Sequence, residues 1–421
     1  MNMLLISNGS RGDINPFISI GLALQRRGHQ VTIISVERYR TVIIAAGLDF
    51  ISCGPEEDYY DPIHHPDAYS QRLKATFVHI ADWLLLGPMR SIYEIIAAFD
   101  PKDTVLVASN LMLGARLANE KLKFPLVTIC LQPFTLWSVE QPPVGLNGIS
   151  LQKVPSIFRK MIYYLLEIRL FDRYLSPQVN LFRKELGLEE INRICSKWCY
   201  STQKVIGLFP EWFAPPSADW PMHTELAGFV QYDEDSDQPL SPEILQFLDS
   251  GSKPILITYG TLIKQANEFF EHSLAAARSL GYRCLVLALD KEQLPLLNTD
   301  NEIHASYIPL NKLLPYCTVV IHGGGIGTIS EALAGGVPQL IVPFINDQPD
   351  NASRLEKLGL SVTVPIKKYT TATALNSLNR LLNATEIKLN CEKYATKIDF
   401  QQAEHDLCVS IEKLMHQGDV V

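Results

Sequence analysis

Short runs of hydrophobic residues alternate along the chain with longer stretches in which hydrophobic residues recur every three or four positions. The first run, 4–6, is followed by a turn-rich loop at 8–13 and by a helical pattern. We expect that helix to begin near Pro16 and to end at 26–28, where two arginines and a glycine provide typical helix-stop residues. Buried strands joined by amphipathic helices predict a parallel sheet covered on both faces.

This alternation occurs twice, on either side of an acidic stretch at 232–239 that is poor in hydrophobic residues. Strands are expected at 4–6, 31–34, 105–107 and 126–129 in the first series, and at 254–258, 284–287, 319–321 and 339–342 in the second. The acidic stretch has the composition of a linker. We therefore predict an α/β protein with two doubly wound, Rossmann-like domains, 1–233 and 240–398, facing each other across a cleft. Such sheets bind ligands at the carboxyl ends of their strands.

The composition of the chain counts against several classes of protein. The chain of 421 residues has 37 Lys and Arg against 45 Asp and Glu, a net charge of −8, which counts against nucleic-acid binding. No hydrophobic run reaches the roughly 18 residues of a membrane span, and the N-terminus does not resemble a secretory signal. The 8 cysteines lack the spacing of a metal site. We expect a cytoplasmic protein with buried thiols and no bound metal.

The loop after the strand at 319–321 carries four glycines in the five positions from Gly323 to Gly327, and a helical pattern starts at once. Glycines let a ligand approach the backbone, and a helix N-terminus offers unpaired N–H groups at the positive end of its dipole. The loop therefore predicts a diphosphate site. The alternative is a tight strand-to-helix turn with no ligand.

Two carboxylates lie in similar loops. Asp347, with Gln348, follows the strand at 339–342, where an acceptor beside an amide suits a ligand rich in hydroxyl groups. Asp13 follows the first strand and is a candidate to take a proton from an alcohol. For both aspartates the alternative is a helix cap. Serine-elbow, kinase-type and G-x-G-x-x-G motifs do not occur, which leaves hydrolase, kinase and dinucleotide oxidoreductase functions without support.

The glycine loop, the tract Gly336–Gln339 and the tract Pro343–Leu355 resemble the donor motif of family 1 nucleotide-sugar glycosyltransferases of the GT-B fold. The opening segment, Gly9–Asp13 with Pro16 and 27–31, is similar to that of the bacterial and sterol-glycosylating branches. The tract 208–221 resembles the rhamnosyltransferases of rhamnolipid synthesis. In this fold a final helix, here 399–421, often packs back on the first domain.

The resemblance implies a role for individual positions. Asp13 would be the general base of an inverting displacement that needs no metal, and the nucleotide sugar would be a co-substrate with no further cofactor. The diphosphate, and the negative charge that develops on it, would be bound by backbone amides of the glycine loop and by the side chains of His322 and Thr328. Thr261 would contact a phosphate. The sugar hydroxyls would be bound by Asp347, Gln348 and Asn351. The base would lie against 307–309. The expected donor residues are Thr261, Tyr307, Ile308, His322, Gly324, Gly325, Ile326, Gly327, Thr328, Asp347, Gln348 and Asn351.

The acceptor is expected in the N-terminal domain, near Ser10, Arg11, Trp83 and Phe134. Two amphipathic segments, 77–96 and 157–175, either pack on the sheet or form an apolar acceptor channel or a face that rests on a membrane. We expect transfer of a hexose or 6-deoxyhexose from a UDP- or dTDP-sugar to a small hydrophobic or lipid hydroxyl acceptor, with a hydroxy-acyl lipid favoured over a sterol or polyketide. A nucleotide-sugar epimerase and a non-catalytic partner remain alternatives.

Overall fold

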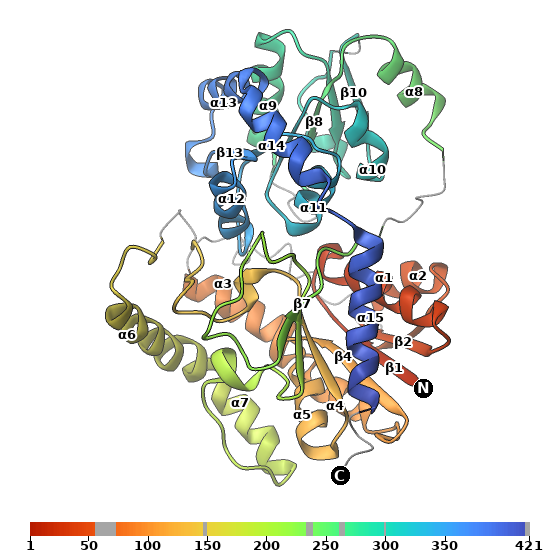
Figure 1. Cartoon of the computed structure of the whole chain (residues 1–421), viewed down its shortest axis with the longest axis vertical. Helices are drawn as coiled ribbons and strands as arrows, with labels where there is room; N and C mark the ends of the chain where they lie inside the picture. Colours follow the sequence, from red (N-terminus) through yellow and green to blue (C-terminus); the bar gives the residue numbers. More distant parts are fainter. Residues whose placement is uncertain (55–72, 146–149, 233–238, 261–265, 299, 417–421) are drawn as a thin grey trace. The chain divides into compact units, whose positions relative to one another are not determined.

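The computed structural model describes residues 1–54, 73–145, 150–232, 239–260, 266–298 and 300–416. The chain divides into two compact units, each built around one parallel sheet (Figure 1). The first unit contains 1–143, 150–232 and 400–421, and the second contains 144–149 and 233–399. The break between Tyr232 and Asp233 falls in the acidic stretch.

The N-terminal sheet has seven strands in the order β3-β2-β1-β4-β5-β6-β7, and every pair in it is parallel. The strand order reverses between β1 and β4, which places the loops after these two strands at the switch point where such sheets bind ligands. β1 and β4 are hydrophobic and buried, as strands covered on both faces must be. The strands are β1 (Asn2–Ile6), β2 (Gln30–Ser35), β3 (Asp49–Ser52), β4 (Thr104–Ser109), β5 (Leu126–Cys130), β6 (Lys204–Gly207) and β7 (Thr224–Leu226).

Helix α1 (Arg11–Arg26) begins five residues earlier than predicted, and Pro16 lies inside it. Asp13 at the third helical position accepts hydrogen bonds from the backbone N–H and the hydroxyl of Ser10, both at 2.7 Å. These bonds stabilise a first helical turn that lies N-terminal to Pro16, so the helix starts before the proline. The other helices of this unit are α2 (Arg40–Ala45), α3 (Leu73–Ile80), α4 (Met89–Ile96), α5 (Leu113–Leu122), α6 (Ser156–Leu166), α7 (Asp172–Glu185) and α15 (Phe400–His416).

The last helix, α15, packs against α1 in the N-terminal unit. Four of its residues, Leu407, Cys408, Ile411 and Leu414, belong to the same buried core as α1 and β1. At the rim, Glu412 accepts hydrogen bonds from Arg27 at 2.8 and 2.7 Å. These bonds lower the pKa of Glu412 to about 2.

The second sheet has six parallel strands in the order β10-β9-β8-β11-β12-β13, and its order reverses between β8 and β11. Its strands are β8 (Ile255–Thr258), β9 (Cys284–Leu287), β10 (Glu302–Ala305), β11 (Val319–His322), β12 (Gln339–Ile341) and β13 (Ser361–Thr363). Its helices are α8 (Pro242–Asp249), α9 (Asn267–Ser279), α10 (Leu310–Leu313), α11 (Ile326–Ala334), α12 (Gln348–Lys357), α13 (Thr371–Asn383) and α14 (Thr385–Ala395). Two doubly wound α/β domains, the predicted fold class, are thereby confirmed.

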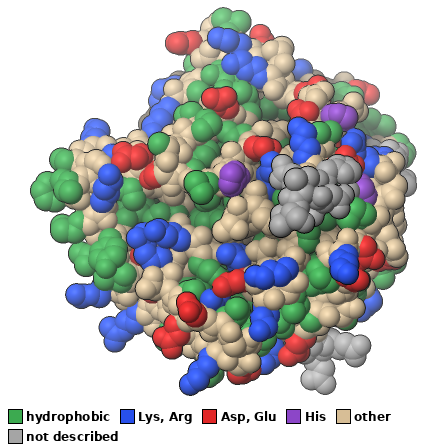
Figure 2. Space-filling view, turned by 60° about the horizontal axis from the view of Figure 1, so that its bottom comes forward, with side chains coloured by type: hydrophobic (Ala, Val, Ile, Leu, Met, Phe, Trp, Pro, Cys, Tyr) green, Lys and Arg blue, Asp and Glu red, His purple; other side chains and the backbone are tan. Residues whose placement is uncertain are grey.

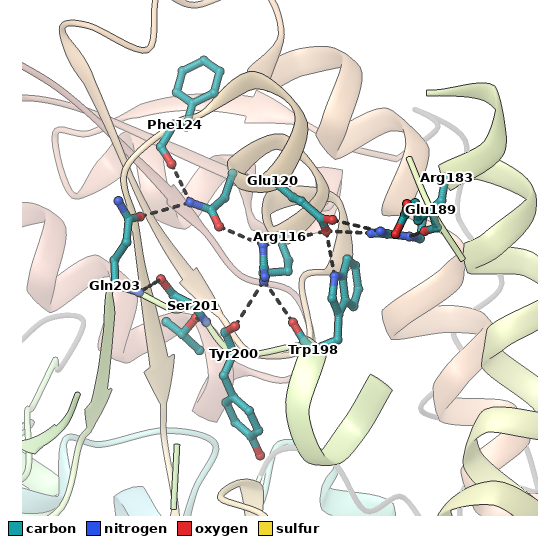
Figure 3. A network of polar contacts seen from close by, with 11 residues as sticks. Arg116, Glu120, Phe124, Arg183, Glu189, Trp198, Tyr200, Ser201 and Gln203 are labelled. Carbon is teal, nitrogen blue, oxygen red and sulfur yellow. Dashed lines mark hydrogen bonds and ion pairs between the residues drawn. The ribbon is translucent and has the colours of Figure 1, made fainter. Parts of the chain in front are cut away.

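A polar network ties α5 and α7 to the segment 198–203 inside the N-terminal unit (Figure 3). The guanidinium of Arg183, whose side chain is 2% exposed, donates to both carboxylate oxygens of Glu120 at 2.6 and 2.9 Å. Trp198 Nε1 donates to the same carboxylate at 2.8 Å. Arg116 Nε reaches the carbonyls of Trp198 and Tyr200 at 3.0 and 3.1 Å. The Arg183 hydrogen bond is the main cause that lowers the pKa of Glu120 to about 2.

We expect Glu120→Gln to destabilise the N-terminal unit by about 3 kcal/mol, because it leaves the buried Arg183 charge without its counter-ion. The loss is measured by urea denaturation followed by tryptophan fluorescence, since all 5 tryptophans lie in this unit. Because the pKa of Glu120 is lowered from 4.5 to about 2, its contribution is present above pH 4.5 and disappears as the pH falls toward 2.

The matched control is Glu185→Gln. Glu185 also pairs with an arginine at 2.6 Å, but both side chains, Arg90 and Glu185, are about half exposed. An exposed pair contributes about 1 kcal/mol at most. Equal losses of unfolding free energy in Glu120→Gln and Glu185→Gln would contradict the claim that burial makes the Glu120–Arg183 pair the more stabilising one.

Candidate functional site

The glycine loop joins β11 to α11 at the carboxyl edge of the second sheet. β11 lies between β8 and β12, next to the point where the strand order reverses. The loop after β12 therefore emerges beside it, because neighbouring parallel strands end at the same edge.

The glycines of this loop divide into two kinds. Gly324 has φ +92, and a side chain there would come within 2.8 Å of Ile341 Cγ2, so only glycine fits. At Gly325 and Gly327, apart from adjacent residues and the helix's own backbone, no described atom lies within 4 Å of where a side chain would start. Gly325 is the N-cap of α11, and among the described residues no side chain caps that end of the helix. The first amides of α11 therefore have no capping partner in the part of the chain that the structure describes, the arrangement that binds anions.

His322 ends β11 and is 1% exposed. Its Nδ1 accepts a hydrogen bond from the N–H of Gly324 at 3.1 Å, and its Nε2 lies 2.9 Å from Gln339 Oε1. Burial lowers the pKa of His322 to about 4, so the ring is neutral at pH 7. In the structure both ring nitrogens of His322 have partners within the protein, so the ring supports the shape of the loop, and its contact with a diphosphate stays a prediction.

The loop between β12 and α12 presents Asp347 and Gln348. The Gln348 side-chain oxygen accepts hydrogen bonds from the N–H groups of Phe344 and Ile345, at 2.8 and 3.2 Å. The amide nitrogen of Gln348 lies 3.6 Å from the ideal side-chain position of Gly323. Gln348 thus uses its acceptor internally and directs its donor toward the glycine loop. Asp347 is partly exposed.

Asn351, in the first turn of α12, joins the two loops. Its side-chain nitrogen donates to the carbonyl of Gly324 at 3.2 Å and to Asp347 Oδ2 at 2.6 Å. The residue is completely buried, and its side-chain oxygen lacks a hydrogen-bond partner among the described residues. The structure therefore brings together His322, Gly324, Asp347, Gln348 and Asn351 from separate parts of the sequence.

The other predicted donor residues lie at the same edge of the sheet or outside the described residues. Thr328 and Ile326 are partly exposed in the first turn of α11. Tyr307 is 40% exposed and Ile308 partly so, in the loop after β10. Thr261 lies outside the described residues.

Two residues that support these loops were given no role in the sequence analysis. Gln339, which holds His322, is fully buried in β12. Tyr259 stacks on Phe269 with ring centroids 4.0 Å apart, and its hydroxyl donates to the carbonyl of Val342 at 3.2 Å. Each looks like an ordinary core or strand residue in the sequence, and only the pairing of strands reveals its partner.

In the N-terminal unit, Asp13 lies at the switch point after β1. Burial raises the pKa of its carboxyl above the ordinary 3.8, against hydrogen bonds from the Ser10 backbone and hydroxyl, which lower it. Gly9 has φ +134, and a side chain there would come within 2.4 Å of Asp13 Oδ2. The loop thus closes tightly around one carboxylate.

The carbonyl of Gly9 receives two donors from the segment after β2. Tyr39 donates its hydroxyl at 2.8 Å, and Arg38 donates a guanidinium N–H. The Arg38 charge also lowers the pKa of Asp13, as the smallest of the contributions named. These two residues were not predicted, because nothing in the sequence connects them to the first loop.

A pocket of about 590 Å³ opens in the same unit. Asn8, from the loop after β1, and Trp83, from the π-helical segment Ala81–Leu86, form part of its wall. Arg38 lies over the Trp83 ring, 5.8 Å from its centre. Of the predicted acceptor residues, the described wall includes Trp83, and it does not include Ser10, Arg11 or Phe134. Its described lining is Asn8, Val36, Ser52, Cys53, Gly54, Trp83, Gly87, Pro88, Ser91, Glu94 and Ile95.

Within the described residues, no group of three or more His, Cys, Asp or Glu side chains could hold a metal ion. The cysteines are free thiols, and all except Cys195 are buried. No described helix combines the length and hydrophobicity needed to cross a membrane.

Comparison with known proteins gives two domain matches. Residues 3–139 match the glycosyltransferase family 28 N-terminal domain, and residues 275–403 match the C-terminal domain of erythromycin biosynthesis protein CIII-like proteins. The chain is 24% identical to the O-mycaminosyltylonolide 6-deoxyallosyltransferase of Streptomyces fradiae over 98% of this chain and 97% of that protein.

A sterol 3-beta-glucosyltransferase of Candida albicans is 25% identical over 98% of this chain, which spans only 27% of the yeast protein. The solved structure of the glycosyltransferase VinC in complex with dTDP has a TM-score of 0.66 and 17% identity, covering 99% of this chain and all of VinC. That likeness shows the fold. The two domain matches and a glycosyltransferase relative aligned over nearly its whole length identify the chain as a nucleotide-sugar glycosyltransferase of the GT-B type.

Proposed function

We propose that the enzyme transfers a hexose or 6-deoxyhexose from a UDP- or dTDP-sugar to a hydroxyl group of a hydrophobic acceptor, with inversion at the anomeric carbon. The observation that carries the proposal is the N-terminus of α11, which no described side chain caps, behind two open glycines. A diphosphate placed there meets several N–H groups and the positive end of a helix dipole. The dTDP in the VinC structure supports a donor of this class.

In the proposed reaction Asp13 takes the acceptor's hydroxyl proton as the acceptor oxygen bonds to the anomeric carbon. The bond from that carbon to the diphosphate oxygen breaks, and the nucleoside diphosphate leaves with the electron pair. The amides of α11 stabilise the charge that grows on the diphosphate. Gln348 and Asp347 offer a donor and an acceptor to the sugar hydroxyls.

The acceptor is proposed to occupy the pocket beside Asn8 and Trp83. Its wall combines hydrophobic side chains with a few polar groups, the usual make-up of a site for a small organic molecule. The relatives named for a tylonolide and for a sterol support a hydrophobic acceptor. We favour a hydroxy-acyl lipid, as in rhamnolipid-type transfer, and propose that the enzyme meets it at the inner face of the membrane.

We expect Gly327→Leu to weaken dTDP and UDP binding by about tenfold or more without lowering the melting temperature. A side chain at this open position obstructs the approach to the amides, and the loss of one hydrogen bond to a charged ligand is worth about tenfold. Isothermal titration measures binding. Gly324→Ala provides the contrast: it strains a left-handed backbone against Ile341, so its melting temperature should fall. Normal nucleotide binding by Gly327→Leu would argue against this site.

We expect Asp13→Asn to lower kcat by roughly a hundredfold or more, the usual effect of losing a general base. Nucleotide binding should be unchanged, because the donor loop lies in the other unit. Sugar transfer to a 3-hydroxyacyl acceptor from dTDP-rhamnose and UDP-glucose, followed by mass spectrometry, gives the rate. Near-normal turnover would refute the proposed role of Asp13.

The pH profile tests the same carboxylate more finely. Asp13 acts as a base only when ionised, so kcat/KM should fall with decreasing pH at a value above the ordinary 3.8, since burial raises its pKa. Ser10→Ala removes a hydroxyl hydrogen bond that lowers this pKa, so the acidic limb should move to higher pH. Ser7→Ala is the control, because the Ser7 hydroxyl bonds only the backbone carbonyl of Asp13, at 2.9 Å. If the acidic limb of the pH profile moves equally in Ser10→Ala and Ser7→Ala, the limb reports the ionisation of a group other than Asp13.

A further inference from the structure

Helix α6 exposes an unusual amount of hydrophobic surface. None of its residues is buried. Six hydrophobic side chains on this one helix are between 37% and 70% exposed: Ile157, Phe158, Met161, Ile162, Tyr164 and Leu165. Hydrophobic and Lys or Arg side chains gather at the left in Figure 2, the side on which α6 lies in Figure 1.

The exposed side chains share one face of the helix. Ile157, Met161 and Leu165 follow one another at four-residue spacing, and Phe158 and Ile162 form a second row beside them. The opposite face packs on the protein: Tyr163 meets the ring of Trp137 with centroids 5.2 Å apart. The hydrophobic face is therefore an outer face, and turning the helix inward would break the contacts of its inner face.

The helix is held firmly at its C-terminal end. There the π-helical segment Glu167–Phe171 begins, and the buried Glu167 accepts hydrogen bonds from Arg193 Nε at 2.8 Å and from the N–H of Ser196 at 2.9 Å. The buried Asp172 accepts from the N–H groups of Arg193 and Ile194 at 2.7 and 3.1 Å. The outer face thus belongs to a fixed element of the fold.

The exposed charged side chains of the segment that contains this helix are positive. Between residues 150 and 178 the exposed charged side chains are Lys153, Lys160, Arg169 and Arg173, and the acidic ones, Glu167 and Asp172, are buried. Two exposed carboxylates from other segments approach it: Glu140 lies 3.7 Å from Lys160 and 3.3 Å from Arg159, and Asp82 accepts a hydrogen bond from the Tyr174 hydroxyl at 2.6 Å. The positive exposed charges of this segment contrast with the net charge of −8 of the whole chain.

We propose that α6 is a membrane-docking helix that lies in the plane of an anionic lipid surface. Its hydrophobic face enters the boundary between headgroups and acyl chains, and the four cations meet the phosphates. The inference rests on the proposed function insofar as a lipid-borne acceptor gives the docking its purpose. The binding itself requires no acceptor.

A second copy of the chain fits this face less well. In a two-fold contact the same patch occupies both sides, so the cations of one copy would meet those of the other. Like charges at close range oppose such a contact, whereas an anionic bilayer compensates all of them. Charge complementarity therefore selects the lipid surface.

Sedimentation of the full chain with vesicles tests the proposal. Vesicles of phosphatidylcholine with one third phosphatidylglycerol should bind the protein, pure phosphatidylcholine vesicles should bind it several-fold less, and added salt should weaken binding. Phe158→Ser with Met161→Ser should reduce binding about tenfold or more, since two half-exposed hydrophobic side chains no longer enter the lipid. Lys160→Glu with Met161→Ser should have a similar effect.

The matched control lies on α14, where Lys388 and Leu389 are a neighbouring exposed pair like Lys160 and Met161. Leu389 is 58% exposed and Met161 52%. Lys388→Glu with Leu389→Ser should leave vesicle binding unchanged. Equal loss in both pairs, or no binding by the unaltered protein, overturns the proposal. A dimer seen by light scattering without lipid and abolished by the α6 changes overturns it in favour of a second copy.

Nucleotide titration on the same variants separates this inference from the proposed function. Vesicle binding lost with dTDP and UDP binding intact is the result expected for the α6 variants. If the protein transfers sugar to a soluble acceptor but does not bind vesicles, the docking proposal is wrong and the proposed transferase function stands. If it binds vesicles but transfers no sugar, the proposed transferase function is wrong and the docking proposal stands.

Discussion

The amide groups in the first turn of α11 have no side-chain cap among the described residues, so they are available to a ligand. The residues behind the turn keep it in this state: the ring of His322 holds Gly324, and Asn351 fastens the glycine loop to the loop of Asp347. With its pKa lowered to about 4, His322 keeps one protonation state through the physiological range. Charge complementarity toward a diphosphate therefore comes from fixed backbone dipoles, which need no reorganisation when charge develops.

The N-terminal unit presents a different kind of group at the switch point of its own sheet, after β1, the strand whose counterpart in the second sheet is β8. There the helix after β1 also begins at a switch point, but Asp13 turns back onto Ser10. A carboxylate already occupies the place where an anion would lie, so this helix start does not suit a phosphate. It presents a partly buried base instead. One topology, repeated, thus gives an electropositive backbone site in one unit and an acid–base group in the other.

Most of the fold follows from hydrophobic periodicity, and the details of the site do not. Runs such as 105–107 and 319–321 are too hydrophobic for any position except a covered parallel strand, so β4 and β11 were predicted at nearly their observed places. The start of α1 was misplaced because Pro16 looks like a first-turn residue, whereas hydrogen bonds to Ser10 decide the boundary. The neutral state of His322 follows from its burial, and its ring is held by Gln339, a neighbour in the sheet that is 17 residues away. Motifs show which residue types gather in a loop, but long-range pairing decides which of their atoms are already engaged.

The two amphipathic segments show a further limit of sequence patterns. Both 77–96 and 157–175 repeat hydrophobic residues at helical spacing, yet Met89, Ile92 and Ile96 are buried in α4 while the corresponding face of α6 meets solvent. Periodicity defines a hydrophobic face without saying what covers it. For α4 the cover is the protein itself, since it packs on α5. For α6 the neighbouring charges supply the missing information: a hydrophobic face on a segment whose exposed charges are cationic, in a chain that is acidic overall, is suited to a surface that is itself hydrophobic and anionic.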